Sequence, residues 1–196
     1  MSSTNFNDIL KQFNEWLKEA QGKEPEYAEA MSLATATKNG MPSVRMVLLK
    51  DVDERGFVFY TNLTSRKAQE LNENPNAALC FHWKSLSKQI RVEGTVSLVN
   101  EKEADVYFAS RPRASRIGTW ASKQSQAMHD RFEFETRIAK YTAKFNIGDI
   151  PRPEFWSGFR LNPHRIEFWH EKTFRLHDRS VFLLDDGEWR MEHLYP

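Results

Sequence analysis

Short segments rich in branched and aromatic residues recur along most of this 196-residue chain, and turn-forming residues separate them. Three of these segments follow one another at residues 31–37, 43–50 and 56–62, and the Asn39-Gly40 pair between the first two is a strong hairpin signal. The pattern returns at residues 77–83, 88–99, 164–171, 173–184 and 188–194. About seven strands at short intervals predict a mainly β, α+β fold in which an antiparallel sheet forms a closed or nearly closed barrel.

Two helices are predicted near the first strands, one before them and one after them. Apolar residues between residues 7 and 20 fall at the spacing of one helical face. A second, shorter helix is expected at 64–75, with Thr64 or Ser65 as its cap and Asn74-Pro75 as its stop. Both helices would pack against the outside of the barrel.

The middle of the chain alternates between helical and irregular patterns. Asn100 followed by Glu103 resembles a capping box, and the helix it begins should end at the next proline. Residues 111–128, dense in Arg, Ser and Gln, are expected to form a loop, and a charged helix should follow at about 129–145. Prolines and glycines exclude regular structure from residues 146–159.

Length and charge narrow the class of protein. We expect one domain, with a helix and lead-in at 1–28 and the barrel, its inserted helices and its C-terminal strands at 29–196. Lys plus Arg total 28 and Asp plus Glu total 27, so a formal charge of +1 offers no bulk attraction to nucleic acid or to a lipid surface. No apolar run approaches the roughly 18 residues of a membrane span, and the first ten residues do not resemble a signal peptide. The only cysteine, Cys80, lies in an apolar segment that we expect to be buried, which favours a reducing, cytoplasmic setting.

The segment TFRLHDRSVF carries three groups that can be positive at every second position, namely Arg175, His177 and Arg179. If this segment is a strand, the three side chains share one face, and such a face is suited to an anion. The alternative is a solvated edge strand, on which positive side chains prevent unwanted pairing.

Further cationic groups lie near the expected helix at 64–75. Arg66 and Lys67 fall in its first turn, where unpaired backbone amides favour an anion, although a solvent-exposed pair is also possible there. Arg45 and Lys50 are five residues apart, which puts them on opposite faces of a regular strand. They therefore either serve different groups or are brought together by a twist or bulge.

Polar groups that could clamp an oxyanion or read a ring follow later. Tyr107 and Arg111 share a helical face, and Ser115 should lie just past the helix end, although an arginine stacked on a surface tyrosine explains the pair equally. Gln124, Ser125 and Gln89 offer donors and acceptors of the kind that a flavin or a base requires, but loop solubility is the competing explanation.

Taken in order, these stretches resemble the pyridoxamine 5'-phosphate oxidase family. The resemblance runs from about residue 30 to the C-terminus and is carried by the segments 45–50, 59–62, 65–71, 89–94, 107–118, 121–125, 167–169 and 175–179. It implies a homodimer of antiparallel split β-barrels with flavin mononucleotide (FMN) bound at the subunit interface.

The resemblance also implies roles for individual residues. The flavin phosphate and its surroundings would be held by Arg45, Arg66, Lys67 and Ser125. The rest of the cofactor would be contacted by Tyr60, Thr61, Gln89, Gln124, Trp169 and Arg179, with the backbone of Arg45, Met46, Val47, Leu48, Leu49 and Lys50 running along it. The substrate phosphate would be bound by Lys50, Tyr107, Arg111 and Ser115, and the substrate ring would be covered by Arg175, Leu176 and His177.

The implied activity is oxidation of pyridoxine 5'-phosphate and pyridoxamine 5'-phosphate to pyridoxal 5'-phosphate, with O2 as acceptor, H2O2 as product and ammonia released from the amine. Arg175 and His177 would be the catalytic residues, and no metal is expected because no His, Cys and carboxylate set has ligand spacing. Phe174 and His193 depart from the family pattern at positions that bear on substrate preference and terminal packing. The alternatives are another flavin reductase or cofactor-handling protein of the split-barrel class, or a non-catalytic carrier of FMN or pyridoxal phosphate.

Overall fold

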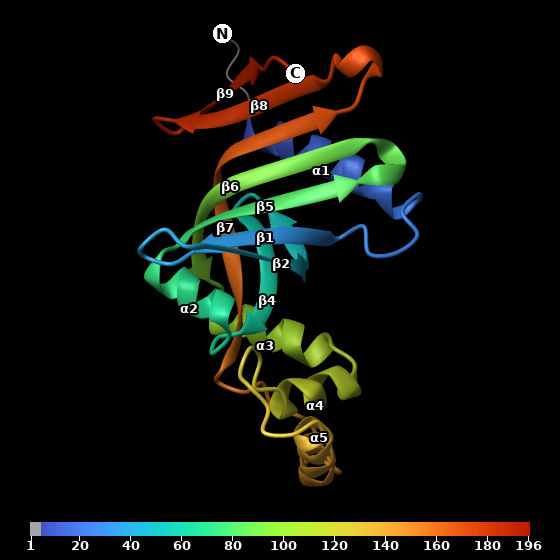
Figure 1. Ribbon diagram of the computed structural model, residues 1–196, viewed down its shortest axis with the longest axis vertical. Helices are drawn as coiled ribbons and strands as arrows, with labels where there is room; N and C mark the ends of the chain where they lie inside the picture. Colours follow the sequence, from blue (N-terminus) through green and yellow to red (C-terminus); the bar gives the residue numbers. More distant parts are fainter. Residues whose placement is uncertain (1–4) are drawn as a thin grey trace.

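The computed structural model describes residues 5–196, so the first four residues of the expected lead-in lie outside the described part. Nine strands form one antiparallel sheet there, in the order β2-β1-β5-β6-β7-β4-β3, with β8 paired to β7 and β9 paired to β8 (Figure 1). The strands are β1 (Ala30–Ala36), β2 (Pro42–Leu48), β3 (Asp51–Asp53), β4 (Gly56–Asn62), β5 (Asn76–Trp83), β6 (Lys88–Leu98), β7 (Trp156–His170), β8 (Asp178–Asp185) and β9 (Glu188–His193). The helices are α1 (Phe6–Gln21), α2 (Arg66–Glu73), α3 (Glu101–Ser110), α4 (Arg113–Ala121) and α5 (Glu133–Lys144), with short 3-10 turns η1 (Lys84–Leu86) and η2 (Thr173–Arg175).

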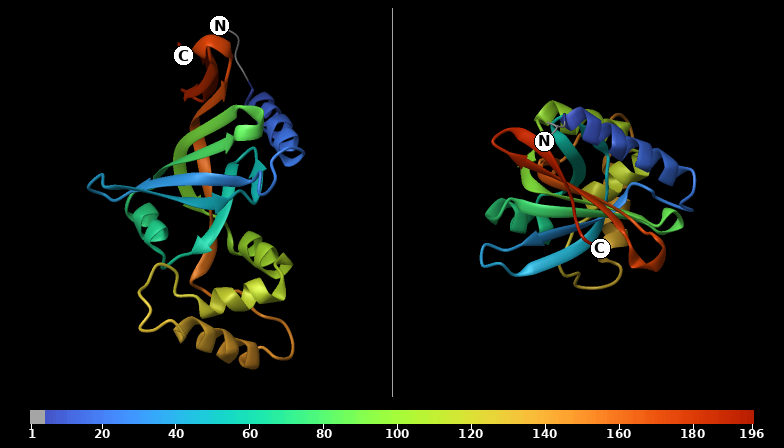
Figure 2. Two further views of the ribbon diagram at one scale, coloured as in Figure 1. Left: turned by 45° about the vertical axis from the view of Figure 1, so that its right-hand side comes forward. Right: turned by 90° about the horizontal axis from the view of Figure 1, so that it is seen from above.

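The sheet curls into a half-barrel and does not close. Strand β7 pairs with β4 near its beginning, with β8 near its end, and with β6 along most of its length. Among the described residues the two ends of the main strand order, β2 and β3, form no ladder with each other. Viewed from above, the strands wrap around an interior that α1 covers on one side (Figure 2). The predicted antiparallel split barrel is confirmed, in an open form.

Helix α1 covers the barrel interior through aromatic contacts. The Phe13 ring meets the rings of Phe57 and Phe81 edge to face, with centroids 5.0 Å and 5.2 Å apart, and all three side chains are buried. The Asn5 side chain accepts a hydrogen bond from the Asn7 amide and so caps the helix. The helix predicted at 7–20 is confirmed, as are the short helix at the expected second position and the hairpin at Asn39-Gly40.

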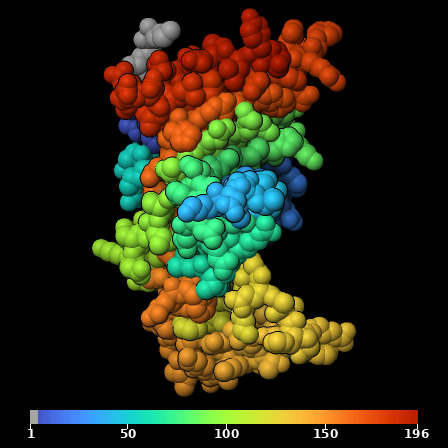
Figure 3. All heavy atoms as spheres, turned by 60° about the vertical axis from the view of Figure 1, so that its left-hand side comes forward, coloured from blue at the N-terminus to red at the C-terminus, as the bar shows by residue number. Residues whose placement is uncertain are grey.

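A helical end lies beyond the sheet. Helices α3, α4 and α5 gather at the end of β7 that is opposite to β8 and β9, and in the space-filling view this end projects from the sheet (Figures 1 and 3). Its own apolar cluster contains Phe108, Ile117, Phe145, Ile150 and Trp156. None of the helices between residues 5 and 196 is both long and apolar enough to cross a bilayer.

The loop predicted at 111–128 is wrong in its first half, because α4 occupies Arg113–Ala121. Pro112 precedes the helix with a φ of −52°, which is suited to a helix start. Ile117 and Ala121, four residues apart, are both buried on one helical face. The polar and small residues of this stretch concealed that short apolar face.

The strand predicted from residue 173 is also wrong in its first part. Residues 173–175 form the turn η2, in which Phe174 and Arg175 have φ values of 59° and 60°, and β8 begins only at Asp178. The reason is pairing: the last ladder partner of β8 is His170, where β7 ends, so the preceding residues have no strand to bond. Arg175 and His177 therefore do not share a strand face with Arg179.

Two boundaries also differ from the prediction. The irregular stretch was expected to reach residue 159, but β7 already begins at Trp156, where pairing with Asn62 of β4 offsets the glycine at position 158. The short strand β3 at Asp51–Asp53, which pairs with β4, was not predicted.

Gly94 is expected to be essential for the pairing of β6 with β7. It lies at the register shift between these strands, and a Cβ there would come within 2.1 Å of the Asn162 carbonyl oxygen. Because this obstacle is backbone, Gly94→Ala should destabilise the protein by about 1–3 kcal/mol, measured by urea unfolding. Gly22→Ala is the matched control, since a Cβ there would meet its nearest atom at 3.5 Å and its stability should change by less than about 0.5 kcal/mol. Equal stability of the two variants would contradict this reading of the bulge.

Candidate functional site

A cavity of about 820 Å³ lies where the sheet meets the helical end, which is within the size range of sites for small ligands and cofactors. Segments far apart in the sequence line it: β2, the end of β4, the start of α2, both α3 and α4, and the loop after α4. The predicted site residues that line it are Arg45, Met46, Val47, Leu48, Lys50, Tyr60, Thr61, Arg66, Lys67, Tyr107, Arg111, Ser115, Gln124 and Ser125.

The open question about Arg45 and Lys50 is answered by this cavity. Strand β2 ends at Leu48, and the Lys50 amide donates a hydrogen bond to the Val58 carbonyl, so the chain turns after the strand. Both side chains reach the same cavity as a result. Leu49, whose backbone was expected to run along the cofactor, is buried and is not among the lining residues.

Lys67 joins the start of α2 to the loop after α4. Its side chain is buried, and its Nζ lies 3.2 Å from both Thr61 Oγ1 and Gln124 Oε1, and 3.5 Å from Ser65 Oγ. Burial lowers the pKa of the Lys67 ammonium, and the nearby charge of Arg45 lowers it further. A buried ammonium without a carboxylate of its own would gain from an anion in the cavity.

Two of the lining arginines share a single buried carboxylate. Arg45 Nη2 donates to Glu70 Oε2 at 3.1 Å, and Arg66 Nε donates to Glu70 Oε1 at 2.8 Å. The hydroxyls of Thr35 and Ser43 also donate to Glu70. Burial by itself would raise the pKa of Glu70, but these four donors lower it to about 2.

Three stacked aromatic side chains, those of Tyr60, Tyr107 and Trp156, form another part of the cavity lining, which we call the aromatic wall. The Tyr60 ring stacks on Tyr107 with centroids 4.0 Å apart and on Trp156 at 5.2 Å, and the Arg111 guanidinium lies 4.8 Å from the Trp156 centroid. Burial raises the pKa of Tyr60 to about 12 and also raises the pKa of Tyr107. Both phenols therefore stay protonated at neutral pH and can donate a hydrogen bond.

The α3–α4 corner brings three predicted phosphate ligands to this wall. Tyr107 lies on α3, Arg111 follows that helix, and Ser115 lies in the first turn of α4 rather than beyond a helix end. Arg111 Nη1 also donates to Thr119 Oγ1 at 2.7 Å, and this bond restrains the guanidinium. A phenol, a guanidinium, a hydroxyl and the Lys50 side chain thus all contribute to the lining of one cavity.

The remaining predicted residues form a second cluster. Gln89, Trp169 and Arg179 are ladder partners in a row across β6, β7 and β8, and the His177 ring lies 4.8 Å from the Trp169 centroid. Arg179 Nη1 donates to the Tyr195 carbonyl at 2.9 Å. The cavity lining includes none of Gln89, Trp169, Arg175, Leu176, His177 and Arg179.

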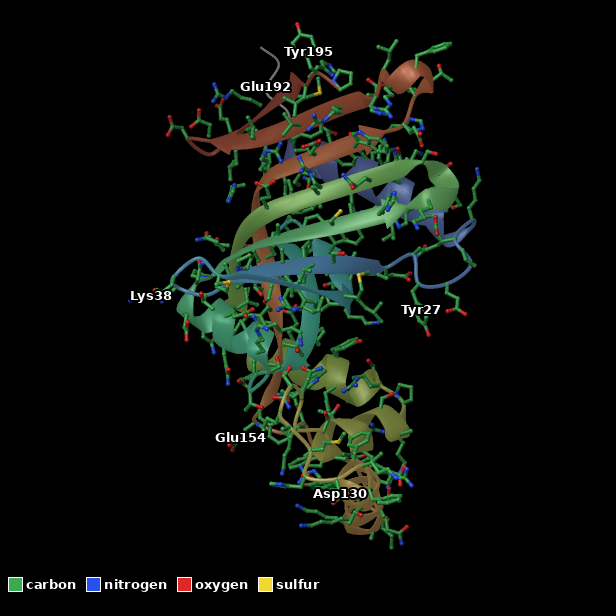
Figure 4. All side chains as sticks on the ribbon, in the orientation of Figure 1. Tyr27, Lys38, Asp130, Glu154, Glu192 and Tyr195 are labelled. Carbon is green, nitrogen blue, oxygen red and sulfur yellow. The ribbon has the colours of Figure 1, made fainter. Side chains whose placement is uncertain are left out.

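The two clusters are separated along β7: the cavity lies where the sheet meets the helical end, and the second cluster lies at the other end of the sheet. Strand β7 begins at Trp156, which lines the cavity, and reaches Trp169 only near its far end, on the order of 40 Å away along an extended strand. In Figure 4, Tyr195 marks the end where Arg179 lies, and Asp130 marks the helical end. One chain therefore carries two separate halves of the predicted site.

Glu167 organises the second cluster, as Glu70 organises part of the first. It is 1% exposed and accepts hydrogen bonds from Arg91, from Arg165 Nη2 at 2.9 Å, and from Arg179 Nε and Nη2 at 2.9 Å and 2.8 Å. Burial opposes its charge, but the three arginines lower the pKa of the carboxyl. Sequence reasoning missed both carboxylates, although Glu70 lies four residues after Arg66 on a helix and Glu167 two residues after Arg165 on a strand.

Residues 5–196 contain no group of three or more His, Cys, Asp or Glu side chains arranged to hold a metal. Cys80 is half-buried rather than fully buried as expected, and burial raises the pKa of its thiol. A protonated thiol is a poor nucleophile, so Cys80 is not prepared for covalent catalysis.

Comparison with known proteins gives consistent matches along the chain. The sequence pattern of the pyridoxamine 5'-phosphate oxidase family matches residues 17–145, and that of the pyridoxine 5'-phosphate oxidase C-terminal dimerisation region matches residues 156–196. The pyridoxine/pyridoxamine 5'-phosphate oxidase of Brucella anthropi is 54% identical over 195 residues, which cover 98% of this chain and 96% of that protein. The protein of the same name from Brucella canis is 57% identical over 189 residues, or 95% of this chain and 93% of that protein.

Two solved structures are informative. PhzG from Burkholderia lata, in complex with tetrahydrophenazine-1-carboxylic acid, has a TM-score of 0.91 and 32% sequence identity, over 96% of this chain and 92% of that one. A pyridoxamine 5'-phosphate oxidase-related, FMN-binding protein from Nostoc punctiforme has a TM-score of 0.76 at 19% identity, with 100% of both chains covered, and shows the same fold.

Replacing Glu167 with Gln should destabilise the protein at neutral pH by about 2–3 kcal/mol, because three partly buried arginines lose the buried carboxylate that they share. The folded-state pKa of Glu167 is below the usual 4.5, so its stabilisation is complete above about pH 4.5 and is lost as the pH falls toward the folded value. The difference in unfolding free energy between wild type and Glu167→Gln should therefore be largest near neutrality and shrink in acid. Urea unfolding at a series of pH values measures it.

Glu93→Gln is the matched control for this prediction. Glu93 accepts from Arg165 alone, at 2.8 Å, and its side chain is 38% exposed, so its loss should cost less than about 1 kcal/mol. A Glu167→Gln defect that stays constant down to strongly acidic pH would show that the charge of Glu167 is not what stabilises the cluster.

Proposed function

Because the chain belongs to the pyridoxamine 5'-phosphate oxidase family, we propose that it is an FMN-dependent oxidase that converts pyridoxine 5'-phosphate and pyridoxamine 5'-phosphate to pyridoxal 5'-phosphate. Electrons would pass to O2, giving H2O2, and ammonia would leave from the amine. The observation that supports the proposal is the cavity, whose lining combines cations from β2 and α2 with Tyr107, Arg111 and Ser115 from the α3–α4 corner.

The residues of the cavity fit a flavin phosphate. Arg45, Arg66 and the buried Lys67 line the cavity beside the first turn of α2. The Ser65 side chain caps none of the backbone amides of that turn and so leaves them available. Thr61 and Gln124 would contact the polar edge of the ring. The bound flavin would supply the redox chemistry, and the protein would supply position and charge.

The second cluster would come from another subunit. Trp169, Arg175, His177 and Arg179 all lie within residues 156–196, the part that matches a dimerisation region, and Gln89 is the ladder partner of Trp169. Beside the cavity, β2 is a strand at the end of the sheet order with Val44 and Met46 exposed at 68% and 63%. An apolar edge of this kind is suited to a partner. We infer a homodimer with the flavin at the interface, each site completed by the partner's Arg179 and Trp169.

Substrate binding would use the clamp on the aromatic wall. Lys50, Tyr107, Arg111 and Ser115 would hold the substrate phosphate and so fix the position of the reacting C4' carbon, which lowers the entropic part of the barrier. Tyr107 would donate its phenol proton in a hydrogen bond, because burial keeps it protonated. The partner's Arg175 would stabilise charge at the reacting end, and the partner's His177 would orient the ring or move a proton there.

A related oxidase activity on a ring without phosphate is the second candidate. It is favoured by the likeness to PhzG and by Phe174, whose 92% exposed ring lies next to Arg175 in the turn η2. The convergence of Lys50, Tyr107 and Arg111 on one wall supports the phosphorylated substrates instead.

The direct test is the visible spectrum of the purified protein, recorded without air before and after addition of pyridoxine 5'-phosphate. We expect a bound flavin band that bleaches and that air restores, together with new pyridoxal phosphate absorbance. Pyridoxine without its phosphate is the matched control and should bleach the band far more slowly. A flavin band that no B6 compound bleaches would contradict the proposal and favour a carrier or the second candidate.

Single substitutions in the two clusters should have different effects. Lys67→Ala should weaken flavin retention, because it removes the buried cation at the phosphate. Arg175→Ala should lower turnover while the flavin stays bound, because Arg175 would face the substrate only. Flavin content after gel filtration and steady-state rates measure the two effects, and exchanged phenotypes would contradict the assignments.

Combining the two variants tests whether the site is shared. A heterodimer of one Lys67→Ala chain and one Arg175→Ala chain, purified through two different tags, would contain one doubly impaired site and one intact site. Its activity should be about half that of the wild-type dimer. An inactive heterodimer would show that both clusters serve the same chain's site.

A further inference from the structure

Glu70 lies directly beneath the cationic side of the cavity without lining it. Its side chain is 5% exposed. Its Oε2 accepts from the hydroxyls of Thr35 and Ser43, both at 2.5 Å, and from Arg45 Nη2 at 3.1 Å, and its Oε1 accepts from Arg66 Nε at 2.8 Å. One carboxylate on α2 thus gathers donors from β1, from β2 and from its own helix.

This carboxylate is negative at neutral pH, since its pKa is lowered to about 2. A fixed negative charge close to a phosphate site weakens anion binding by simple Coulomb repulsion. The repulsion must be offset if the cavity is to bind a phosphate. The contacts of Glu70 suggest how, because both of its cationic partners are arginines that line the cavity.

Arg45 is held on several sides. Its Nη1 donates to the Thr35 hydroxyl and, at 3.3 Å, to the Leu33 carbonyl, while its Nη2 donates to Ser43 and Glu70. Thr35 and Ser43 in turn donate to Glu70, so the carboxylate and the guanidinium share the same two hydroxyls. Loss of the carboxylate would release this network as a unit.

Arg66 is held through one nitrogen. Its side chain is 62% exposed, and the described hydrogen bonds engage only its Nε, which leaves both terminal nitrogens to donate to a ligand. An unrestrained exposed arginine loses rotamer freedom when it binds a ligand, and a partner at Nε removes part of that cost in advance.

We propose that Glu70 is a positioning residue for the phosphate side of the cavity. It orients Arg66, whose terminal nitrogens donate to the phosphate of the flavin, and it holds Arg45 beside that phosphate as a fixed positive charge, without touching the flavin itself. This inference rests on the proposed function, because it takes the ligand to be FMN. It predicts the direction in which the affinity for FMN changes when the charge of Glu70 is removed. If Glu70 acted only through its charge, removing the charge would strengthen phosphate binding, whereas loss of positioning must weaken it.

The experiment measures flavin binding to the apoprotein and needs no turnover. Wild type and Glu70→Gln are titrated with FMN and with riboflavin, which lacks the phosphate, and binding is followed by quenching of flavin fluorescence. We expect Glu70→Gln to bind FMN about tenfold more weakly, as for the loss of a charged hydrogen-bond partner, and to bind riboflavin unchanged. Glu73→Gln, an exposed glutamate on the same helix, is the matched control and should leave both affinities unchanged.

A double substitution separates an effect on arginine orientation from an effect on the overall structure of the protein. In an Arg66→Ala background, Glu70→Gln should cost less FMN affinity than in wild type, because one of the two oriented arginines is already absent. If Glu70→Gln does not fold, Ser43→Ala is used instead. It removes one donor from the network, keeps the carboxylate, and should cause a smaller loss that is again confined to FMN.

The outcomes are distinguishable. Unchanged or stronger FMN binding by Glu70→Gln would overturn the positioning role, and so would an equal loss for FMN and riboflavin, which would indicate a purely structural effect. A wild-type protein that does not distinguish FMN from riboflavin would overturn the phosphate site of the proposed function, and the inference with it.

Discussion

The pairing of β7 with β4, β6 and β8 is the constraint on which the rest of the structure depends. At its beginning β7 supports the aromatic wall through Trp156, and near its end it carries Trp169 and Glu167 beneath Arg179. Because a paired strand is stiff, the two clusters are held at the two ends of the half-barrel and cannot fold onto each other. In the proposed dimer, this separation leaves a second subunit to supply the other half of each site.

Buried carboxylates give both clusters a common design. Glu70 and Glu167 are each almost inaccessible, and each accepts from two or more arginines, among which Arg45, Arg66 and Arg179 belong to the proposed site. Burial opposes the ionised form in both cases. Hydrogen bonds more than offset it, from the hydroxyls of Ser43 and Thr35 and from two arginines at Glu70, and from three arginines at Glu167. An arginine held in this way is already ordered before a ligand arrives, which favours binding of an anion without new conformational cost.

Sequence reasoning located every strand except the short β3, as well as α1 and most of the cavity residues, but it failed where a local pattern was misleading. Helix α4 was missed because only Ile117 and Ala121 mark its buried face, among polar residues typical of loops. The alternation of Arg175, His177 and Arg179 indicated one strand, but β7 ends at His170 and leaves the first two residues without a strand partner. The spacing of Arg45 and Lys50 could not decide whether they meet, since a strand's end is set by its neighbours.

The sequence by itself determined most of the strands and helices, and which cations and amides are available to the proposed flavin and phosphate sites. Hydrophobic periodicity and turn residues are local, so they can be read along the chain. The tertiary structure alone decided that residues from 45 to 125 share one cavity, that Gln89, Trp169 and Arg179 form a second cluster, and that Glu70 and Glu167 are buried beneath arginines. Those facts depend on pairing and burial between distant segments, for which no local pattern carries a signal.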